Sequence, residues 1–275
     1  MKEKPFEELT ITDDFMFTKV MQNQELCKKF LEMLLSVKIL QITYPQGQKT
    51  IDIAYDSKGI RLDVYVDDEM GTIYNIEMQT TKRKNLPKRS RYYQGMIDLD
   101  LLEKGVDYEE LQKSYVIFIC TFDPFETGRH IYTFKNICLE DTGIQLKDEN
   151  IKIFVNTKGT MNDISPELQD LMDYFNGIAA KQGFAKELHH EVEKIKKNED
   201  WRREYMTLEM MKRELYKDGF GDGKEQGLAH GLEQGIINSI EVALSFGIDE
   251  ETAFSKVAAQ YKMSVDEIRH IWEKQ

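Results

Sequence analysis

Cysteine and histidine are scarce in this sequence of 275 residues, which contains three cysteines and five histidines. Cys27, Cys120 and Cys138 are odd in number, lie far apart and form no CxxC pair. This spacing argues against a disulfide framework and against a thiolate zinc site, and it fits a reducing compartment. The one histidine pair, His189-His190, precedes a charged stretch and is expected on a helix surface rather than at a metal.

Long hydrophobic runs are missing as well. No apolar stretch reaches the length of about 18 residues that a transmembrane helix needs. The first ten residues, MKEKPFEELT, lack the apolar core of a secretory signal. The sequence therefore predicts a cytoplasmic protein that has no membrane partner.

Excess positive charge is absent too, because the formal net charge is −12. This value disfavours a protein that coats nucleic acid non-specifically. It does not exclude an enzyme that uses one local basic patch. The position of the basic residues therefore matters more than the net charge.

The apolar pattern predicts an α/β domain over residues 1–180 and a charged helical tail over 181–275. Alternating residues predict a meander of three strands, and the continuous run 114–122 predicts a strand that is buried on both faces. Asn23 is able to interrupt the first helix. The expected helices are 12–36, 87–104 and 165–180, and the expected strands are 50–56, 59–68, 72–80, 114–122, 131–136 and 150–157.

Acidic and amide side chains recur in the second and third strands of the meander. Side chains alternate between the two faces of a strand, so Asp63 shares a face with Arg61 and Tyr65, while Glu77 and Gln79 share a face of the next strand. If the hairpin turns about Met70, position 63 comes opposite position 77.

Two carboxylates about 5 Å apart across a hairpin repel each other and call for a compensating cation. Hard oxygen ligands of this kind suit Mg²⁺ or Mn²⁺. The backbone carbonyl of Met78 is a further candidate ligand. The metal would polarise a phosphate oxygen and lower the pKa of a bound water, as phosphodiester hydrolysis requires.

The alternative is an ordinary solvated sheet face, where Asp, Glu and Gln are common. Asp63 argues against it, because aspartate is a poor strand former and sits in mid-strand here. The third strand also leads into a basic segment that contains no acid and could bind phosphates beside the scissile one. Its basic residues are Lys82, Arg83, Lys84, Lys88, Arg89 and Arg91.

Several segments in order resemble the PD-(D/E)XK nuclease family transposases, also called recombination-promoting nucleases. They are DDFMFTKVMQNQELCKKFLEMLL, RLDVYVDDEMGTIYNIEMQ, KRSRYYQGMIDLDLLEKGVDYEEL and YVIFICTFDPF. The resemblance covers roughly residues 8–180. It implies a restriction-endonuclease-like core, with a mixed β-sheet flanked by helices. It also implies Mg²⁺-dependent DNA cleavage, linked to recombination, mobile elements or phage defence, and no small-molecule substrate.

The resemblance also implies site residues. Asp63 matches the first acidic ligand and Glu77 the second, while Gln94 on the following helix matches a further site position. An acid of the first helix often completes the metal site, and Asp14 is the candidate, with Glu25 and Glu32 behind it. Gln79 stands where the superfamily usually has lysine. Glutamine can only orient by hydrogen bonds, so a catalytically silent module that binds DNA or protein is the alternative to an enzyme.

The tail carries glycines at every fourth position, Gly219, Gly223, Gly227, Gly231 and Gly235. On a helix they would line one face and allow close approach of another helix, in a homo-oligomer or in a clamp onto the body of the protein. A flexible, weakly helical linker is the other interpretation. Two further helices are expected at 237–260 and 264–274, and Ser264 and Glu267 form a capping box. Their mixed charge favours protein contact over DNA reading.

Overall fold

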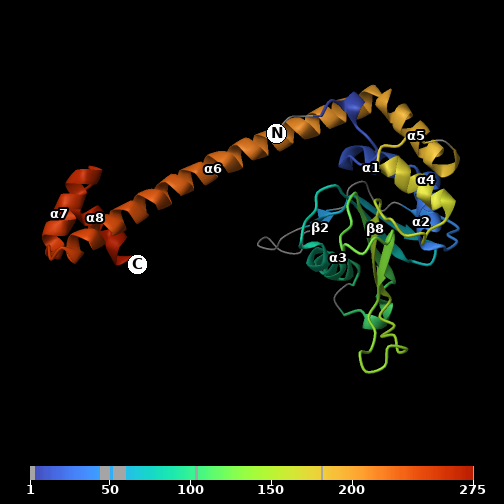
Figure 1. Cartoon of the computed structure of the whole chain (residues 1–275), viewed down its shortest axis with the longest axis horizontal. Helices are drawn as coiled ribbons and strands as arrows, with labels where there is room; N and C mark the ends of the chain where they lie inside the picture. The colour runs from blue at the N-terminus through green and yellow to red at the C-terminus, as the bar shows by residue number, and fades with distance from the viewer. Residues whose placement is uncertain (1–3, 44–49, 52–59, 103–104, 181, 275) are drawn as a thin grey trace. The chain divides into compact units, whose positions relative to one another are not determined.

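The computed structural model describes residues 4–43, 50–51, 60–102, 105–180 and 182–274 (Figure 1). The chain divides into two compact units, Met1–Tyr205 and Met206–Gln275. Three free cysteines agree with the expected lack of a disulfide framework. None of the described helices is both long enough and apolar enough to cross a membrane.

A mixed six-stranded sheet forms the centre of the first unit. The strand order is β1-β4-β5-β6-β8-β7, and a separate two-stranded sheet pairs β2 with β3. Strands β5, β6 and β8 are parallel neighbours, while β1, β4 and β7 pair antiparallel. The strand bounds are β1 Ile42–Thr43, β2 Thr50–Ile51, β3 Ile60–Arg61, β4 Val64–Asp68, β5 Ile73–Gln79, β6 Ser114–Cys120, β7 Ile131–Phe134 and β8 Asn150–Asn156.

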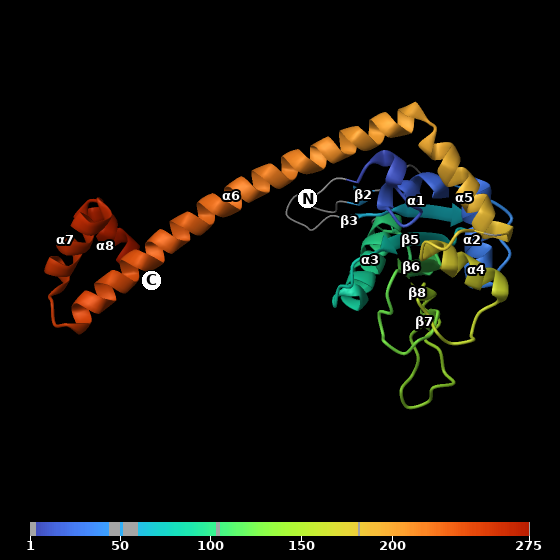
Figure 2. The same cartoon turned by 45° about the horizontal axis from the view of Figure 1, so that its top comes forward.

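Helices cover both faces of this sheet, as the two views show (Figures 1 and 2). Helix α3 (Leu86–Leu101) connects the parallel strands β5 and β6 and packs on one face. Helices α1 (Asp14–Met21), α2 (Gln24–Leu35), α4 (Pro166–Phe175) and α5 (Gly183–Lys196) lie on the other face. Two short 3₁₀ turns, η1 (Phe6–Glu8) and η2 (Tyr108–Glu110), complete the unit.

The expected mixed sheet flanked by helices is confirmed. The run Ser114–Cys120 is buried at every position, as expected for a central parallel strand covered on both faces. The first unit extends past the change in composition at residue 181, because α5 packs on α1, α2 and α4 and buries Phe184, Leu188 and Val192.

Several predicted elements are interrupted. The helix expected at 12–36 is two helices, and the side chain of Asn23 caps the second by accepting a hydrogen bond from the Leu26 N–H at 3.3 Å. The strand expected at 59–68 is divided into β3 and β4 at Leu62 and Asp63. Most of the strand expected at 50–56 lies outside the described residues, and only Thr50–Ile51 is seen as β2.

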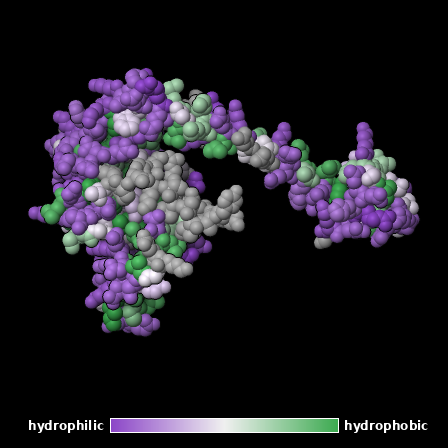
Figure 3. Space-filling model, turned by 180° about the vertical axis from the view of Figure 1, so that it is seen from behind, coloured by the Kyte–Doolittle hydropathy of each residue, from purple (hydrophilic) through white to green (hydrophobic). Residues whose placement is uncertain are grey.

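The connection between β7 and β8 projects from the sheet as a hairpin-like loop. Its arms are joined by hydrogen bonds from Cys138 N–H to Ile144 C=O at 2.9 Å and from Leu146 N–H to Asn136 C=O at 3.0 Å. Hydrophobic side chains gather on this loop (Figure 3), and Leu139 is 84% exposed.

The described part of the second unit contains helices joined by turns and no strand. Helix α6 (Glu199–Ser245) begins in the first unit and carries the glycine repeat; α7 (Glu250–Tyr261) and α8 (Val265–Glu273) follow it. Side chains from α6, α7 and α8, including Ile236, Ile240, Phe254 and Ile268, form a small core. The helix predicted at 237–260 is wrong, because Gly247 turns the chain with φ +77° and Asp249 caps α7. The predicted capping box of Ser264 and Glu267 is present.

Candidate metal centre and nucleic-acid surface

The hairpin of β4 and β5 brings two acids together on the face covered by α3. Val64 pairs with Ile76 and Tyr65 with Asn75, so the same register continued by one residue places Asp63 opposite Glu77. The two residues also hold each other, because the backbone N–H of Asp63 donates to Glu77 Oε1 at 3.3 Å.

Asp63 lies just outside the strand ladder, in the bend before β4. Its Oδ2 accepts a hydrogen bond from the backbone N–H of Met78 at 3.1 Å, and its carbonyl accepts one from Thr18 of α1 at 3.4 Å. The bend therefore turns the Asp63 carboxylate towards β5, and the residue is half-buried.

Glu77 is only 1% exposed, although a carboxylate is among the groups that are most costly to bury. Burial raises the pKa of Glu77, and the neighbouring Asp63 carboxylate raises it further. The Arg89 guanidinium, the Asp63 N–H and Asn75 act in the opposite direction. A raised carboxyl pKa in a partly open site is typical of a functional centre.

Arg89 enters this site from the first turns of α3. Its Nη2 donates to Glu77 Oε2 at 2.8 Å and its Nη1 donates to Gln79 Oε1 at 2.7 Å. Its Nε donates to the hydroxyl of Tyr93, one helical turn along, at 2.8 Å. Arg89 was predicted as a nucleic-acid contact of the basic segment, and the structure instead directs its side chain to the carboxylates.

Gln79 is the last residue of β5 and is buried. Its amide nitrogen donates to the carbonyl of Thr81 at 2.9 Å, which leaves its oxygen to face Arg89. In this arrangement Gln79 orients a cation but is not one itself.

The donor set fits a small hard cation. Asp63 and Glu77 offer carboxylate oxygens from the bend before β4 and from β5, and a carboxylate has about four lone-pair positions for hydrogen bonds or a cation. Within the described ranges, no three His, Cys, Asp or Glu side chains gather closely enough to hold a metal by themselves. A metal held here by two carboxylates would therefore need backbone oxygens, water or substrate oxygens as further ligands.

The two other predicted ligands, Met78 and Asp14, differ in their relation to this pair. The N–H of Met78 points to Asp63, and the N–H and C=O of one strand residue point the same way, so its carbonyl faces that side too. Asp14 lies one helical turn before Thr18, which contacts the Asp63 carbonyl. Asp14 and Glu25 are both exposed, and Glu32 accepts the N–H of Ile39 at 2.9 Å, so these contacts favour none of the three acids as a further ligand.

The structure does not bring Gln94 to this site. Its amide nitrogen donates to Asp98 at 3.0 Å and to the hydroxyl of Ser114. Ser114 begins β6, whereas Gln79 pairs with Cys120 at the end of β6. Gln94 thus occupies the face of α3 that meets the far end of the strand, and Tyr93 is the residue of this stretch that reaches the site through Arg89.

The rest of the basic segment lies at the surface beside the site. Arg83, Lys84, Lys88 and Arg91 are exposed, and Lys82 forms an ion pair with Glu126. They precede or flank Arg89 in the sequence, and the Arg89 side chain is 27% exposed. Exposed cations in this position are suited to contact phosphates.

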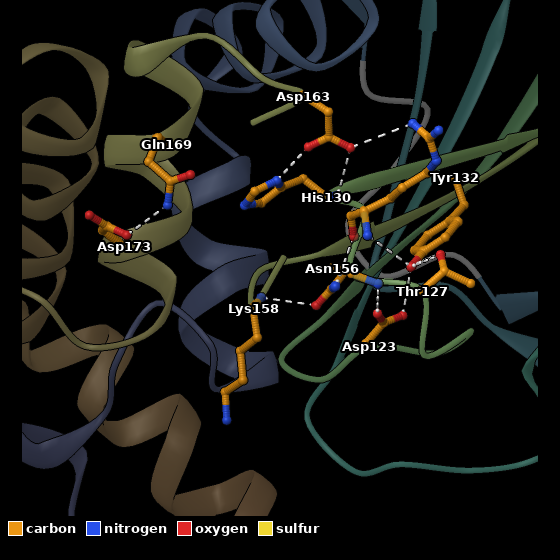
Figure 4. Close-up of polar contacts among 11 residues, drawn as sticks. Asp123, Thr127, His130, Tyr132, Asn156, Lys158, Asp163, Gln169 and Asp173 are labelled. Carbon is orange, nitrogen blue, oxygen red and sulfur yellow. Dashed lines mark hydrogen bonds and ion pairs between the residues drawn. The ribbon is translucent and has the colours of Figure 1, made fainter. Parts of the chain in front are cut away.

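A second polar cluster lies at the end of β8 and in the loops beside it (Figure 4). Asp123 accepts hydrogen bonds from the N–H groups of Gly128 at 2.7 Å and Phe125 at 2.9 Å and from the Tyr132 hydroxyl at 2.8 Å. His130 Nδ1 lies 2.6 Å from Asp163 Oδ1. No periodic sequence pattern indicated this cluster, because its members come from separate loops and from β7.

The His130 ring is packed tightly. A Cβ atom on Gly159 would lie 2.4 Å from it, and Nε2 of the ring is buried without a hydrogen-bond partner among the described residues. Burial acts to raise the pKa of Asp123, but hydrogen bonds from backbone N–H groups hold this pKa below its usual value. The hydrogen bonds of Asp123 and Asp163 thus hold the loops around β7 in place.

Comparison with known proteins supports the assignment that the site suggests. The family model of the PD-(D/E)XK nuclease family transposases matches residues 12–219. No curated protein and no solved structure gives a significant match. The matched range contains the whole sheet, the paired acids and α3. The chain belongs to the PD-(D/E)XK nuclease family transposases.

Proposed function

We propose that this protein is a metal-dependent DNA endonuclease in which Asp63 and Glu77 hold Mg²⁺ or Mn²⁺. The observation that carries the proposal is the buried Glu77 held opposite Asp63 by the hairpin register. Two acids in this position repel each other, and binding of a divalent cation would offset the repulsion. The family supports a nuclease- or transposase-like role.

The reaction in this proposal is hydrolysis of a phosphodiester bond. The oxygen of water bonds to phosphorus and one P–O ester bond breaks. One proton of water goes to the leaving oxygen, and the other is released. A bound divalent ion would supply charge neutralisation and a more acidic water, while the exposed cations Arg83, Lys84, Lys88 and Arg91 hold the flanking DNA backbone.

The biological setting is part of the proposal. DNA recombination, movement of mobile elements and defence against phage all need cleavage of DNA in the cytoplasm, and the family description favours the first two. A tail-mediated homo-oligomer is proposed alongside. Four of the five repeat glycines have open space where a Cβ would stand, which leaves room for another helix. They are Gly219, Gly223, Gly227 and Gly231.

A catalytically silent DNA-binding module is the second candidate. The specific observation in its favour is that Arg89 already donates hydrogen bonds to Glu77 and Gln79. Gln79 also stands where the superfamily usually has lysine. In that case the carboxylates are neutralised internally, and the surface cations alone act on DNA.

The test is a plasmid-nicking assay on the full-length protein in Mg²⁺, Mn²⁺ or EDTA. Asp63→Asn and Glu77→Gln are the test variants, and Glu110→Gln, an exposed acid, is the matched control. Metal-dependent nicking that both test variants lose and the control keeps supports the nuclease. If the folded protein neither binds metal nor cleaves DNA, both with and without residues 206–275, the result supports the catalytically silent module instead. Light scattering of the full-length protein and of the protein without residues 206–275 tests the oligomer. If the tail mediates assembly, the truncated protein forms a smaller assembly.

A further inference from the structure

Arg89 is the side chain at this site whose position the nuclease proposal leaves unexplained. All three of its nitrogen atoms donate hydrogen bonds, to Glu77, Gln79 and Tyr93. Its guanidinium carbon also lies 4.9 Å from the Tyr93 ring centre and 5.1 Å from that of Phe118. The three hydrogen bonds and the two nearby aromatic rings therefore hold the planar group in one place beside the carboxylate.

A guanidinium in this orientation has the chemistry to bind a phosphate diester. Its donors form a rigid fork that matches two phosphate oxygens, and it stays charged at all working pH values. Gln79 carries no charge, so it cannot supply the cation that stabilises developing negative charge during phosphoryl cleavage. Arg89 brings such a cation to the same place from α3, and Gln79 accepts one of its N–H groups.

We propose that Arg89 is a catalytic residue that binds the substrate phosphate at this site, with Gln79 as its positioning residue. The proposal rests on the nuclease function and assigns to Arg89 the task of a lysine at position 79. Because Arg89 also neutralises Glu77 before a ligand arrives, it competes with a divalent cation for the same carboxylate. Arg89 is displaced from Glu77 when the metal binds there, and the released Arg89 guanidinium then binds the substrate phosphate.

This double role makes a prediction that a purely structural ion pair does not make. Loss of Arg89 removes the competitor for Glu77, so metal affinity is unchanged or higher. The same loss removes the cation that contacts the phosphate, so cleavage is slower. A structural counter-ion would affect both properties in the same direction, because a disturbed Glu77 binds metal less well and cleaves less well.

The experiment compares wild-type protein with Arg89→Ala, Arg89→Lys and the double variant Arg89→Ala/Gln79→Lys. Arg203→Ala is the matched control, since Arg203 pairs with Asp200 on an exposed helix surface. Calorimetric titration with Mg²⁺ gives the affinity, and single-turnover cleavage of DNA at saturating Mg²⁺ gives the rate. Thermal melting reports whether each variant is folded.

We expect Arg89→Ala to cleave about 100- to 1,000-fold more slowly, the loss typical of removing one preorganised charge-stabilising group, with Mg²⁺ affinity equal to or above wild type. Lysine at position 89 or at position 79 should restore part of the rate, and Arg203→Ala should match the wild type. Should Arg89→Ala fail to fold, the two lysine-bearing variants decide the matter.

Two results would overturn the proposal. One is a cleavage rate within a few-fold of wild type in folded Arg89→Ala. The other is a rate that neither lysine variant raises, together with a Mg²⁺ affinity below wild type. If wild-type protein itself cleaves nothing, the nuclease proposal fails separately, and weaker Mg²⁺ binding by Arg89→Ala would then overturn the competition between Arg89 and metal.

Discussion

The same sheet carries two clusters of buried or half-buried acids, and they are built in opposite ways. Asp123 and Asp163 bind backbone N–H groups, a tyrosine hydroxyl and a histidine from nearby loops. Asp63 and Glu77 face each other across a hairpin, and Arg89, a long side chain from α3, forms an ion pair with Glu77.

The difference appears in the pKa values of the two groups. Hydrogen-bond donors hold the pKa of Asp123 below its usual value, whereas burial and Asp63 raise that of Glu77. An acid surrounded by backbone donors is stabilised in its charged form and anchors a loop. Glu77, placed beside another acid, depends in part on Arg89, a long side chain from another element, and such a pair of acids is the arrangement expected of a cation-binding site.

The largest expected effect separates the two clusters by activity. Glu77→Gln should abolish Mg²⁺-dependent cleavage and lower Mg²⁺ affinity, because it removes a charged ligand while keeping the shape of the side chain. Asp123→Asn should leave metal affinity unchanged and lower thermal stability, because it weakens the hydrogen bonds of a loop. Calorimetry and melting of both variants check this, and reduced Mg²⁺ affinity in Asp123→Asn would show that the clusters are coupled.

A second effect concerns packing around His130. Gly159→Ala places a methyl group against the imidazole ring, and overpacking of this kind costs about 1–3 kcal/mol. Denaturant unfolding should show this loss, while Mg²⁺ binding stays at the wild-type level. Gly95→Ala on α3 is the control, because a Cβ there meets no atom within 4 Å, and its stability should be unchanged or higher.

A third effect is the response to pH. A raised pKa for Glu77 means that the folded state binds a proton more tightly than the unfolded chain does. Its contribution to stability is complete below the unfolded value near 4.5 and is lost as pH rises through the folded value. Metal binding needs the ionised form, so Mg²⁺ affinity should rise with pH by up to about tenfold per unit until Glu77 is ionised.

Titration of Mg²⁺ from mildly acidic to mildly alkaline buffers checks this sign. Binding should release protons, seen as a dependence of the heat on the ionisation enthalpy of the buffer. In Asp63→Asn the proton release should shrink, because a like charge that raises the pKa is gone. An affinity that is constant over this range would mean that Glu77 is already fully charged in the free protein.

The smallest expected effect lies at the exposed cations. Lys84→Ala should weaken DNA binding evenly across sequences and reduce the slope of log affinity against log salt by about 1. Fluorescence anisotropy in Ca²⁺ at several salt concentrations measures it. Lys186→Ala, an exposed lysine of α5, is the matched control and should leave the slope unchanged.

The paired acids could be predicted because strand geometry is local. Alternation of side chains and the turn about Met70 determine which residues face each other, and the observed pairing of Val64 with Ile76 follows from the same two facts. The strand Ser114–Cys120 could be predicted as well, because a continuous apolar run in an α/β fold indicates a strand that is covered on both faces.

The role of α3 could not be predicted in the same way. Its sequence carries Arg89, Tyr93 and Gln94 within two turns, and the side that meets the site depends on how the helix docks on β5 and β6. Within a run of basic residues, the sequence does not show which side chain turns inward, and here it is Arg89. In the tail, the apolar pattern at 237–260 continued across Gly247, and the turn depends on that one residue having a positive φ.

The hairpin of β4 and β5 has a consequence for the order of folding. Its strands are near neighbours in sequence, whereas β5–β6 and β6–β8 join segments separated by a helix or by the β7 hairpin. Local pairings form sooner because less chain entropy is lost in closing them. Asp63 and Glu77 therefore meet before α3 delivers Arg89, and the nascent hairpin carries two uncompensated negative charges. Refolding of this protein should accordingly be faster in the presence of a divalent cation, even where the final structure is the same.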